Sequence, residues 1–329
     1  MRRRSRMTKL FISLAAMAFL VAACGGDDDG DDGASTPDET VDPEQADAID
    51  LSGVSVTVGS KDFDESILLG QMMVLAAEDK GADVTDQTNL GGTNVNREAL
   101  LSGDIGVYPD YNGTGWTEHL GNEDPSSDPE ELFQVVQEQD LEENGIHWLG
   151  SSDFSNTYGF AVGPDLAESD GPFTFDSMAD YIKENPDANV CLETEFPDRS
   201  DGLVLWEDAT GYEIPTDQIT ILDLNVIYTE TAKGECDFGE VFTTDGRIEG
   251  LDMSLVEDPG AMIIYNVSYT FNDDTYNEAP DAFTELSEAI LAGLSQEKIN
   301  ELNKQVSFDD TPPADVAKEY LESIGLIGG

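Results

Sequence analysis

The sequence predicts an α/β protein built from two lobes. Apolar segments typical of strands alternate with segments that have helical spacing, which is typical of mainly parallel sheets covered by helices. About 280 residues follow the N-terminal region, enough for two lobes that each have a core. Loops at the predicted carboxyl ends of strands, where such sheets usually bind ligands, carry aromatic and polar side chains.

The first 23 residues have the layout of a secretory signal. A basic head precedes an apolar run from Leu10 to Ala23, which is shorter than the roughly 20 residues that a membrane-spanning helix needs. Small residues just before Cys24 resemble the lipobox of bacterial lipoproteins. This resemblance implies a lipidated Cys24 and stable attachment to the membrane surface. The alternative is an ordinary signal peptide with an incidental cysteine.

Residues 24–50 are expected to form an acidic, disordered tether. They are rich in Asp, Gly, Glu and Pro and contain few large apolar side chains, so they cannot bury enough surface to fold.

The formal net charge is −55, and the acidic residues are spread along the whole chain. Nucleic acid is excluded as a partner because the chain has too few cations to neutralise phosphates. Such a surface indicates adaptation to high salt, where screening makes the repulsion tolerable. Beyond residue 23 there are three arginines, for which fixed partners are expected: Arg97, Arg199 and Arg247. For Arg97 and Arg247 we expect structural ion pairs or carbonyl contacts.

Two further cysteines, Cys191 and Cys236, each lie near the start of a predicted strand. In an exported protein this pair favours a disulfide, and the alternative is two buried free thiols.

The first predicted strand covers Val54 to Val58 and leads to Lys61. Asp62 and Glu65 have the spacing of a capping box for a helix that ends at Gly81. Lys61 therefore lies beside the positive end of a helix, a position that favours an anion.

The next stretch, from Asn89 to Trp116, is the one most clearly suited to binding a small molecule. It predicts a short helix from about Asn94 to Ser102 closed by Gly103, an apolar strand from Ile105 to Tyr108, and then an aromatic loop. That edge carries two tyrosines and a threonine but no obvious nucleophile or metal cluster: Tyr108, Tyr111 and Thr114.

The rest of the chain repeats the same alternation. Predicted strands cover 147–149, 158–162, 189–194, 219–222 and 237–242, and 261–269 supplies another extended segment. Helices are expected from Asp128, at about 178–184 and 229–233, and from Ala279 onward. Arg199 falls in a loop at the carboxyl end of a strand.

Five motifs in this order resemble those of the substrate-binding proteins of ABC importers for glycine betaine and other quaternary ammonium compounds, the ProX/OsmF/OpuC group. They are VGSKDFDESILLG, NLGGTNVNREALLSGDIGVYPDYNGT, SNTYGFAV, EFPDRSDG and VFTTDGRI. The resemblance implies a type II periplasmic-binding-protein fold, with a ligand cleft between two lobes. It divides the chain into 51–156 plus 262–329 for the first lobe and 157–261 for the second. The crossings are expected near Phe154 to Tyr158 and between about Ile248 and Tyr265.

Carried over residue by residue, the resemblance implies an aromatic box of Tyr111, Tyr158, Phe242 and Tyr265. It implies carboxylate-binding groups at Lys61, Thr114 and Arg199, with Asn156 bordering the box. Phe242 and Ser66 depart from the tyrosine and glutamine expected there, which bears on substrate preference. The chemistry agrees, because ring faces attract a trimethylammonium group while cations and hydroxyls bind a carboxylate.

The expected function is capture of glycine betaine, or a related zwitterionic osmolyte, by a monomeric, lipid-anchored protein outside the cytoplasm that delivers it to ABC permease subunits. Preference for choline or carnitine and a ligand sensor on the same fold are the alternatives. A hydrolase is disfavoured, because His119 and His147 lie in no catalytic or metal-binding motif. No cofactor and no metal are expected.

Overall fold

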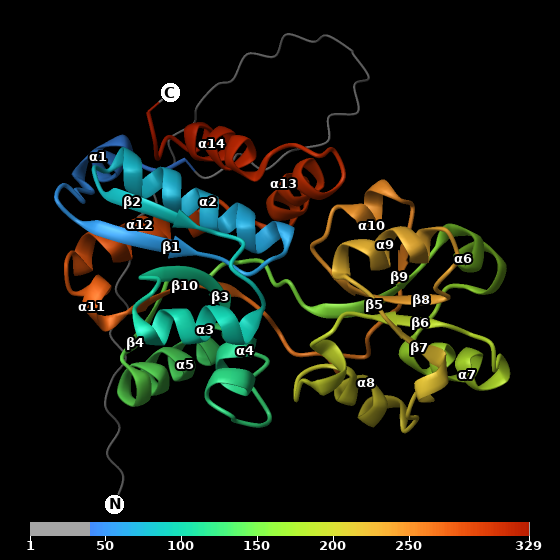
Figure 1. Ribbon diagram of the computed structural model, residues 1–329. Coiled ribbons are helices and arrows are strands. Elements are labelled where there is room, and N and C mark those ends of the chain that lie inside the picture. The colour runs from blue at the N-terminus through green and yellow to red at the C-terminus, as the bar shows by residue number, and fades with distance from the viewer. Residues whose placement is uncertain (1–39, 329) are drawn as a thin grey trace, which may run out of the picture. The chain divides into compact units, whose positions relative to one another are not determined.

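The computed structural model describes residues 40–328, so the predicted signal segment, Cys24 and most of the predicted tether lie outside the described residues. Two five-stranded mixed sheets organise the described chain (Figure 1). The first sheet has the order β2-β1-β3-β10-β4, with strands at Asp83–Gln87, Ser55–Gly59, Val107–Tyr111, Val267–Asn272 and Ile146–Leu149. The second has the order β7-β6-β8-β5-β9, with strands at Ile219–Ile221, Val190–Leu192, Phe238–Phe242, Tyr158–Val162 and Ser254–Leu255.

The two sheets share one topology. In each, three neighbouring strands are parallel, and the fourth strand, β10 or β5, runs antiparallel to both of its neighbours. These two strands are the first that the chain forms after it crosses between the sheets. Because the chain enters each lobe at the carboxyl edge of its parallel strands, the entering strand must run the opposite way.

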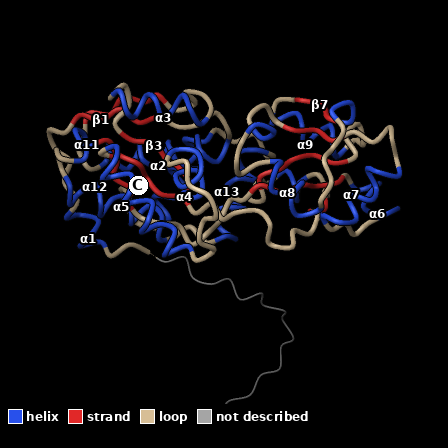
Figure 2. The backbone as a smooth tube through the Cα atoms, turned by 90° about the horizontal axis from the view of Figure 1, so that it is seen from below, coloured by secondary structure: helices blue, strands red, loops and turns tan. Residues whose placement is uncertain are grey.

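Helices cover both faces of each sheet, and Figure 2 shows them enclosing the strands. In the first lobe they are α1 (Pro43–Ala48), α2 (Asp64–Asp79), α3 (Thr93–Ser102), α4 (Asn112–Thr114), a π-helical turn (Gly115–His119), α5 (Pro129–Asn144), α11 (Asp273–Tyr276), α12 (Pro280–Ala292), α13 (Gln296–Ser307) and α14 (Pro313–Ser323). In the second they are α6 (Pro164–Asp170), α7 (Phe175–Glu184), α8 (Leu203–Thr210), α9 (Leu224–Ala232), α10 (Arg247–Gly250) and short 3-10 turns at Phe196–Asp198 and Thr216–Gln218.

Apolar side chains on both faces of each sheet hold these layers together. In the first lobe, α2, α12 and α14 pack on one face, while Leu100 of α3 and Leu132 of α5 pack with Trp148 on the other. In the second lobe, α7 and α8 place Phe175 and Trp206 against one face, and α9 covers the other (Figure 1). Burying a side chain of this size contributes roughly 1.5–3 kcal/mol, so the strands that end at the cleft are held firmly.

Two crossing segments join the lobes, one from β4 to β5 and one from β9 to β10, and they pair with each other. Ser155 and Asn266 form an isolated antiparallel bridge, and the Asn156 backbone N–H donates to the Tyr265 carbonyl at 3.1 Å. The Asn266 side chain donates to the carbonyls of Ser152 and Phe154. The two crossings therefore behave as a single short ribbon.

The end of the predicted tether is ordered, which corrects its expected boundary near Asp50. Asp42 caps α1 by accepting from the Glu44 backbone, Ala46 and Ile49 are buried, and the Val41 N–H donates to the Ile324 carbonyl of the first lobe. An Asp-Pro cap and a few apolar side chains are enough to dock this segment onto an existing surface. None of the helices in 40–328 is both long enough and apolar enough to cross a bilayer.

Candidate functional site

A cavity of about 270 Å³ lies where the carboxyl ends of strands from both sheets converge. Seven of the eight residues that the sequence assigns to the site line it: Lys61, Tyr111, Thr114, Asn156, Tyr158, Phe242 and Tyr265. Tyr111 ends β3, Tyr158 begins β5, Phe242 ends β8, and Asn156 and Tyr265 lie on the two crossing segments. The eighth, Arg199, is buried beside the cavity and does not line it.

The four predicted rings and a fifth, Phe63, form a closed circuit of aromatic contacts. Ring centroids are separated by 5.2 Å for Tyr158 and Phe242, 5.4 Å for Tyr158 and Tyr265, and 6.5 Å for Tyr111 and Tyr265. Phe63 completes the circuit, at 4.9 Å from Phe242 and 6.1 Å from Tyr111. Such a set offers several ring faces to one small cation, each contributing roughly 0.5–2 kcal/mol.

Phe63 was missed because the sequence was interpreted as having a cap at Asp62 and Glu65. The structure begins α2 at Asp64, with Phe63 as its N-cap and no side-chain cap bond. Phe63 occurs inside the KDFDES motif, two residues after Lys61, so its position beside a predicted ligand residue was a usable clue. The side chain of Glu65, expected to cap the helix, is buried instead.

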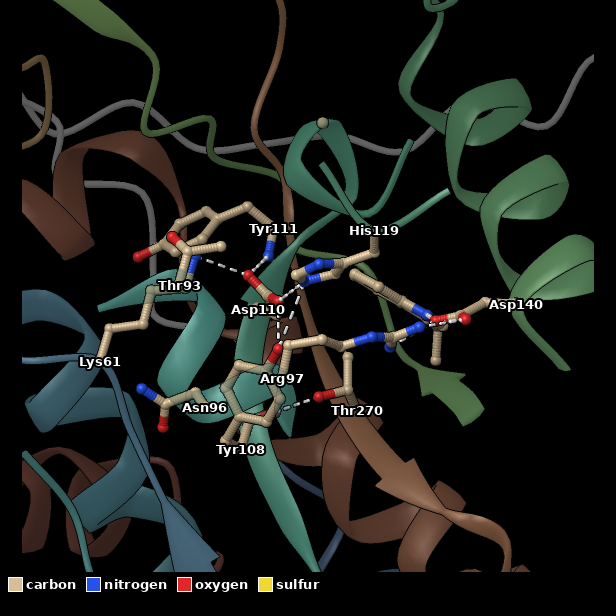
Figure 3. Close-up of polar contacts among 12 residues, drawn as sticks. Lys61, Thr93, Asn96, Arg97, Tyr108, Asp110, Tyr111, His119, Asp140 and Thr270 are labelled. Carbon is tan, nitrogen blue, oxygen red and sulfur yellow. Dashed lines mark hydrogen bonds and ion pairs between the residues drawn. The ribbon is translucent and has the colours of Figure 1, made fainter. Parts of the chain in front are cut away.

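Tyr108 does not belong to the box, although the sequence grouped it with Tyr111. The predicted loop is in fact the end of β3, so neighbouring side chains alternate between the faces of the sheet. Tyr108 is fully buried among α3 and α5, and its hydroxyl donates to Asp110 (Figure 3).

Asp110 is a buried carboxylate that organises the first-lobe side of the cavity. It lies 2.9 Å from the Lys61 ammonium, accepts from the Tyr111 backbone N–H at 2.8 Å, and contacts the His119 ring at 2.7 Å (Figure 3). Burial alone would raise its pKa, but Lys61 and His119 outweigh burial, so the pKa of Asp110 lies well below its usual range. The Lys61 charge is therefore balanced within the protein.

Arg199 is likewise engaged by the protein. Its Nε and Nη2 donate to the two oxygens of Asp201 at 2.7 and 2.8 Å, its Nη1 donates to Thr93 of the first lobe, and its guanidinium lies 5.5 Å from the Tyr158 ring centroid. Asp201 also accepts from Thr117 of the first lobe at 2.8 Å. This ion pair tethers the second lobe to the first and supports a ring of the box.

Acidic side chains outnumber cations on the cavity wall. Asp62, Glu193, Glu195 and Asp223 line it, while Lys61 is the lining cation and is paired with Asp110. Burial raises the pKa of Glu193. An acidic wall beside aromatic rings favours a ligand with a positively charged head.

Thr114 and Asn156 supply polar atoms. Thr114 is buried in α4, where the chain packs closely: a Cβ on Gly113 would lie 2.5 Å from the Ile264 carbonyl of a crossing segment. The Asn156 amide donates to Glu65 at 2.9 Å, and its buried Oδ1 has no hydrogen-bond partner among the described residues.

The other predicted features lie outside the cavity. Arg97 is held by two hydrogen bonds to Asp140, and Arg247 by Asp245 and Asn225 (Figure 3 for Arg97). Cys191 and Cys236 are joined in a disulfide that packs with Ile227 of α9.

Two lobes of matching topology, joined by paired crossings around a ring-lined cavity, define a substrate-binding protein of the periplasmic-binding-protein class. Residues 54–323 match the substrate-binding domain of the ABC-type glycine betaine transport system, and the chain belongs to this family.

Known proteins agree with this assignment. The glycine betaine-binding protein YehZ of Escherichia coli K12 is 27% identical over 277 residues, which span 82% of this chain and 90% of that protein. The carnitine transport binding protein OpuCC of Listeria monocytogenes is 26% identical over 279 residues, or 84% of this chain and 88% of that protein. The solved structure of apo YehZ superposes with a TM-score of 0.60 at 26% identity, covering 83% of this chain and 99% of that one.

Proposed function

We propose that this chain captures a small quaternary ammonium compound, with glycine betaine as the first candidate, and delivers it to the permease subunits of an ABC importer. The closed circuit of five rings around the cavity is the observation that supports this most directly. A trimethylammonium group offers no N–H donors, so ring faces are its natural partners. The family and the relatives named above support the transport role.

The proposal assigns ligand contacts to the seven lining residues that the sequence singled out and to Phe63. Among the polar lining residues, Thr114 and Lys61 are assigned to a ligand carboxylate, and Arg199 acts by holding Tyr158 and the contact between the lobes. The lobes are proposed to divide as 51–156 plus 262–329 and 157–261.

Calorimetric titration of residues 40–329 with glycine betaine tests the function. We expect binding that Tyr158→Ala and Phe242→Ala each weaken at least about tenfold, because each removes a ring face from the cation. Tyr276→Ala is the matched control, since that ring stacks on His147 and does not line the cavity. Absence of heat with the unmodified domain, or unchanged affinity in both box variants, would contradict the proposal.

Choline is the second candidate, and the paired cations favour it. If Lys61 and Arg199 were free, their charges would repel a ligand that lacks a carboxylate, but Asp110 and Asp201 balance them. Competition between choline and glycine betaine for the same domain separates the two. Tighter binding of choline would indicate that the acidic residues of the cavity wall determine ligand preference and that a ligand carboxylate is not required.

We infer that the chain has no catalytic role of its own. Both histidines have aspartate partners, His119 with Asp110 and His147 with Asp273, and neither lines the cavity. Turnover of a betaine ester or amide by the purified domain would contradict this inference.

We also propose that Cys24 is lipidated after removal of residues 1–23, and that the protein acts as a monomer on the outer side of the cell membrane. We expect the unmodified protein to incorporate labelled fatty acid and to be found in the membrane fraction. Cys24→Ala should abolish this incorporation and release the protein from the membrane fraction.

The net charge of −55 supports a further proposal, that the protein is adapted to high salt. Raising KCl from about 0.1 M to about 1 M shortens the screening length from about 10 Å to about 3 Å and should raise the unfolding temperature.

A further inference from the structure

Glu65, the second residue of α2, has a buried carboxylate whose two oxygens both accept hydrogen bonds. The residue is 4% exposed, and its side chain accepts four hydrogen bonds from side chains. It does not line the ligand cavity. Desolvating an ionised carboxylate is costly, so a protein keeps one buried only where donors surround it.

The two oxygens of Glu65 face different parts of the molecule. Oε1 accepts from the Tyr111 hydroxyl at 2.8 Å and from the Asn156 amide at 2.9 Å, and both of these residues line the cavity. Oε2 accepts from the Thr244 hydroxyl at 2.6 Å and from the Asn303 amide at 2.7 Å, and neither of these lines it. One carboxylate therefore joins the ligand box to a region outside the box.

That region is a contact between the lobes. Thr244 lies in the loop of residues 243–246 between β8 and α10 of the second lobe, here called the Thr244 loop, and Asn303 lies on α13 of the first lobe. The Asn303 amide also donates to the Thr244 carbonyl at 3.0 Å, and a Cβ on Gly246 would lie 2.2 Å from the Lys304 Cα, so the loop and α13 meet at backbone distance. Nearby, Arg247, the first residue of α10, lies 3.4 Å from Asp64, the residue before Glu65.

We propose that Glu65 is a positioning residue that couples the Tyr111 ring of the ligand box to the contact of the Thr244 loop with α13. Oε1 fixes the tyrosine hydroxyl and the crossing segment, while Oε2 is satisfied only when Thr244 and Asn303 are in place. Loss of the Thr244 contact leaves a buried oxygen short of a donor, and the carboxylate shifts or hydrates with Tyr111 attached to it. The inference rests on the proposed function, because its readout is the affinity of the box for a quaternary ammonium ligand.

The test is a double-mutant cycle between Tyr111→Phe and Thr244→Val, read as the dissociation constant for glycine betaine. Each change deletes one hydroxyl and nearly preserves shape. Thr244→Val, although it lies off the cavity, should weaken binding about tenfold, because it removes a hydrogen bond to a charged group in one network. In the Tyr111→Phe background the same change should have a much smaller effect.

Thr270→Val is the matched control. It removes a buried threonine hydroxyl that donates to the Tyr108 carbonyl in the first sheet, away from Glu65. Both variants should lower the unfolding temperature by a similar amount, but Thr270→Val should leave ligand affinity unchanged. If Thr244 had only a structural role, the two variants would have the same effect on affinity. Glu65→Gln should abolish the coupling, and the cycle itself does not depend on that variant folding.

The outcomes separate the inference from the function on which it rests. If the unmodified domain binds glycine betaine but Thr244→Val keeps its affinity, or if the two changes are additive, the coupling through Glu65 is wrong and the binding function stands. If the unmodified domain binds neither glycine betaine nor choline, the proposed function falls and the inference with it.

Discussion

The ammonium of Lys61 lies 2.9 Å from the carboxylate of Asp110, and both side chains are buried. A cation that the sequence assigns to the ligand carboxylate thus already has a partner inside the protein. Removing Asp110 would leave the Lys61 ammonium buried without a counter-charge. Asp110 therefore affects both the stability of the protein around Lys61 and the net charge that this side of the cavity presents to a ligand.

Asp110→Asn should lower the free energy of unfolding by about 3–5 kcal/mol, since it leaves the Lys61 ammonium buried without a counter-charge. Where the variant folds, a ligand carboxylate can replace the lost one, so the preference should move toward zwitterions. Denaturant unfolding and titrations with glycine betaine and choline measure the two effects. Adding Lys61→Met should recover part of the stability. Full stability in Asp110→Asn alone would show that the pair contributes little.

Phe63→Leu tests the ring that the sequence interpretation missed. Leucine keeps the apolar bulk but removes the ring face, so affinity for the quaternary ammonium ligand should fall about threefold to thirtyfold. Stability should change little, because the side chain is only partly buried. Phe133→Leu, at a partly buried ring packed outside the cavity, serves as the control in the same titration. Equal affinities for both variants would remove Phe63 from the site.

The buried side chain of Glu240 should make the stability of the protein depend on pH, which Glu240→Gln tests. Glu240 is fully buried in β8, and burial first, then the neighbouring Glu193, raises its pKa well above the ordinary value of 4.5. The folded state therefore keeps a proton that the unfolded state releases, and this residue costs stability as pH rises from about 4.5 toward the raised pKa.

Glutamine cannot ionise, so the variant should gain on the order of 1 kcal/mol over the unmodified domain at pH 8 and much less at pH 4. Thermal unfolding of the two proteins across this range measures the difference. A stability difference that stays constant with pH would mean that Glu240 does not carry the raised pKa.

The disulfide between Cys191 and Cys236 closes a loop with a sequence separation of 45. Replacing both cysteines with serine should cost about 2–4 kcal/mol of unfolding free energy through the loop entropy of the unfolded chain. Ligand affinity should be unchanged, because neither cysteine lines the cavity. Reducing agent applied to the unmodified domain provides the parallel measurement. A large loss of affinity would indicate that the bond also shapes the site.

The sequence predicts the fold well where the period of apolar residues is clear. Helix α3 and its C-terminal Gly103, in the left-handed conformation, match the expected helix from Asn94 to Ser102 within one residue. Strands were expected at 158–162 and within 261–269, but the antiparallel direction of β5 and β10 was not predicted, because direction follows from where the chain enters each lobe and local pattern contains no such information.

Seven of the eight residues assigned to the site line one cavity, but the contacts that connect them to the rest of the protein were not predicted. The loops that carry Tyr111, Tyr158 and Phe242 do converge on one cavity. The roles of Arg199 and Glu65 could not be derived, because their partners lie far away in sequence: Arg199 reaches Thr93, and Glu65 reaches Thr244 and Asn303. Local sequence suggested a helix cap for Glu65 and a ligand contact for Arg199, but in the structure both side chains are bound by residues distant in sequence.

The paired crossings place two lining residues, Asn156 and Tyr265, on the segments that connect the two lobes. If one lobe rotates relative to the other, these segments act as the hinge. A ligand that contacts Asn156 or Tyr265 therefore lies close to the axis of rotation. Phe63 and Phe242 travel with opposite lobes and meet at 4.9 Å. Opening of the lobes would therefore separate these two rings, which now close the cavity from opposite sides.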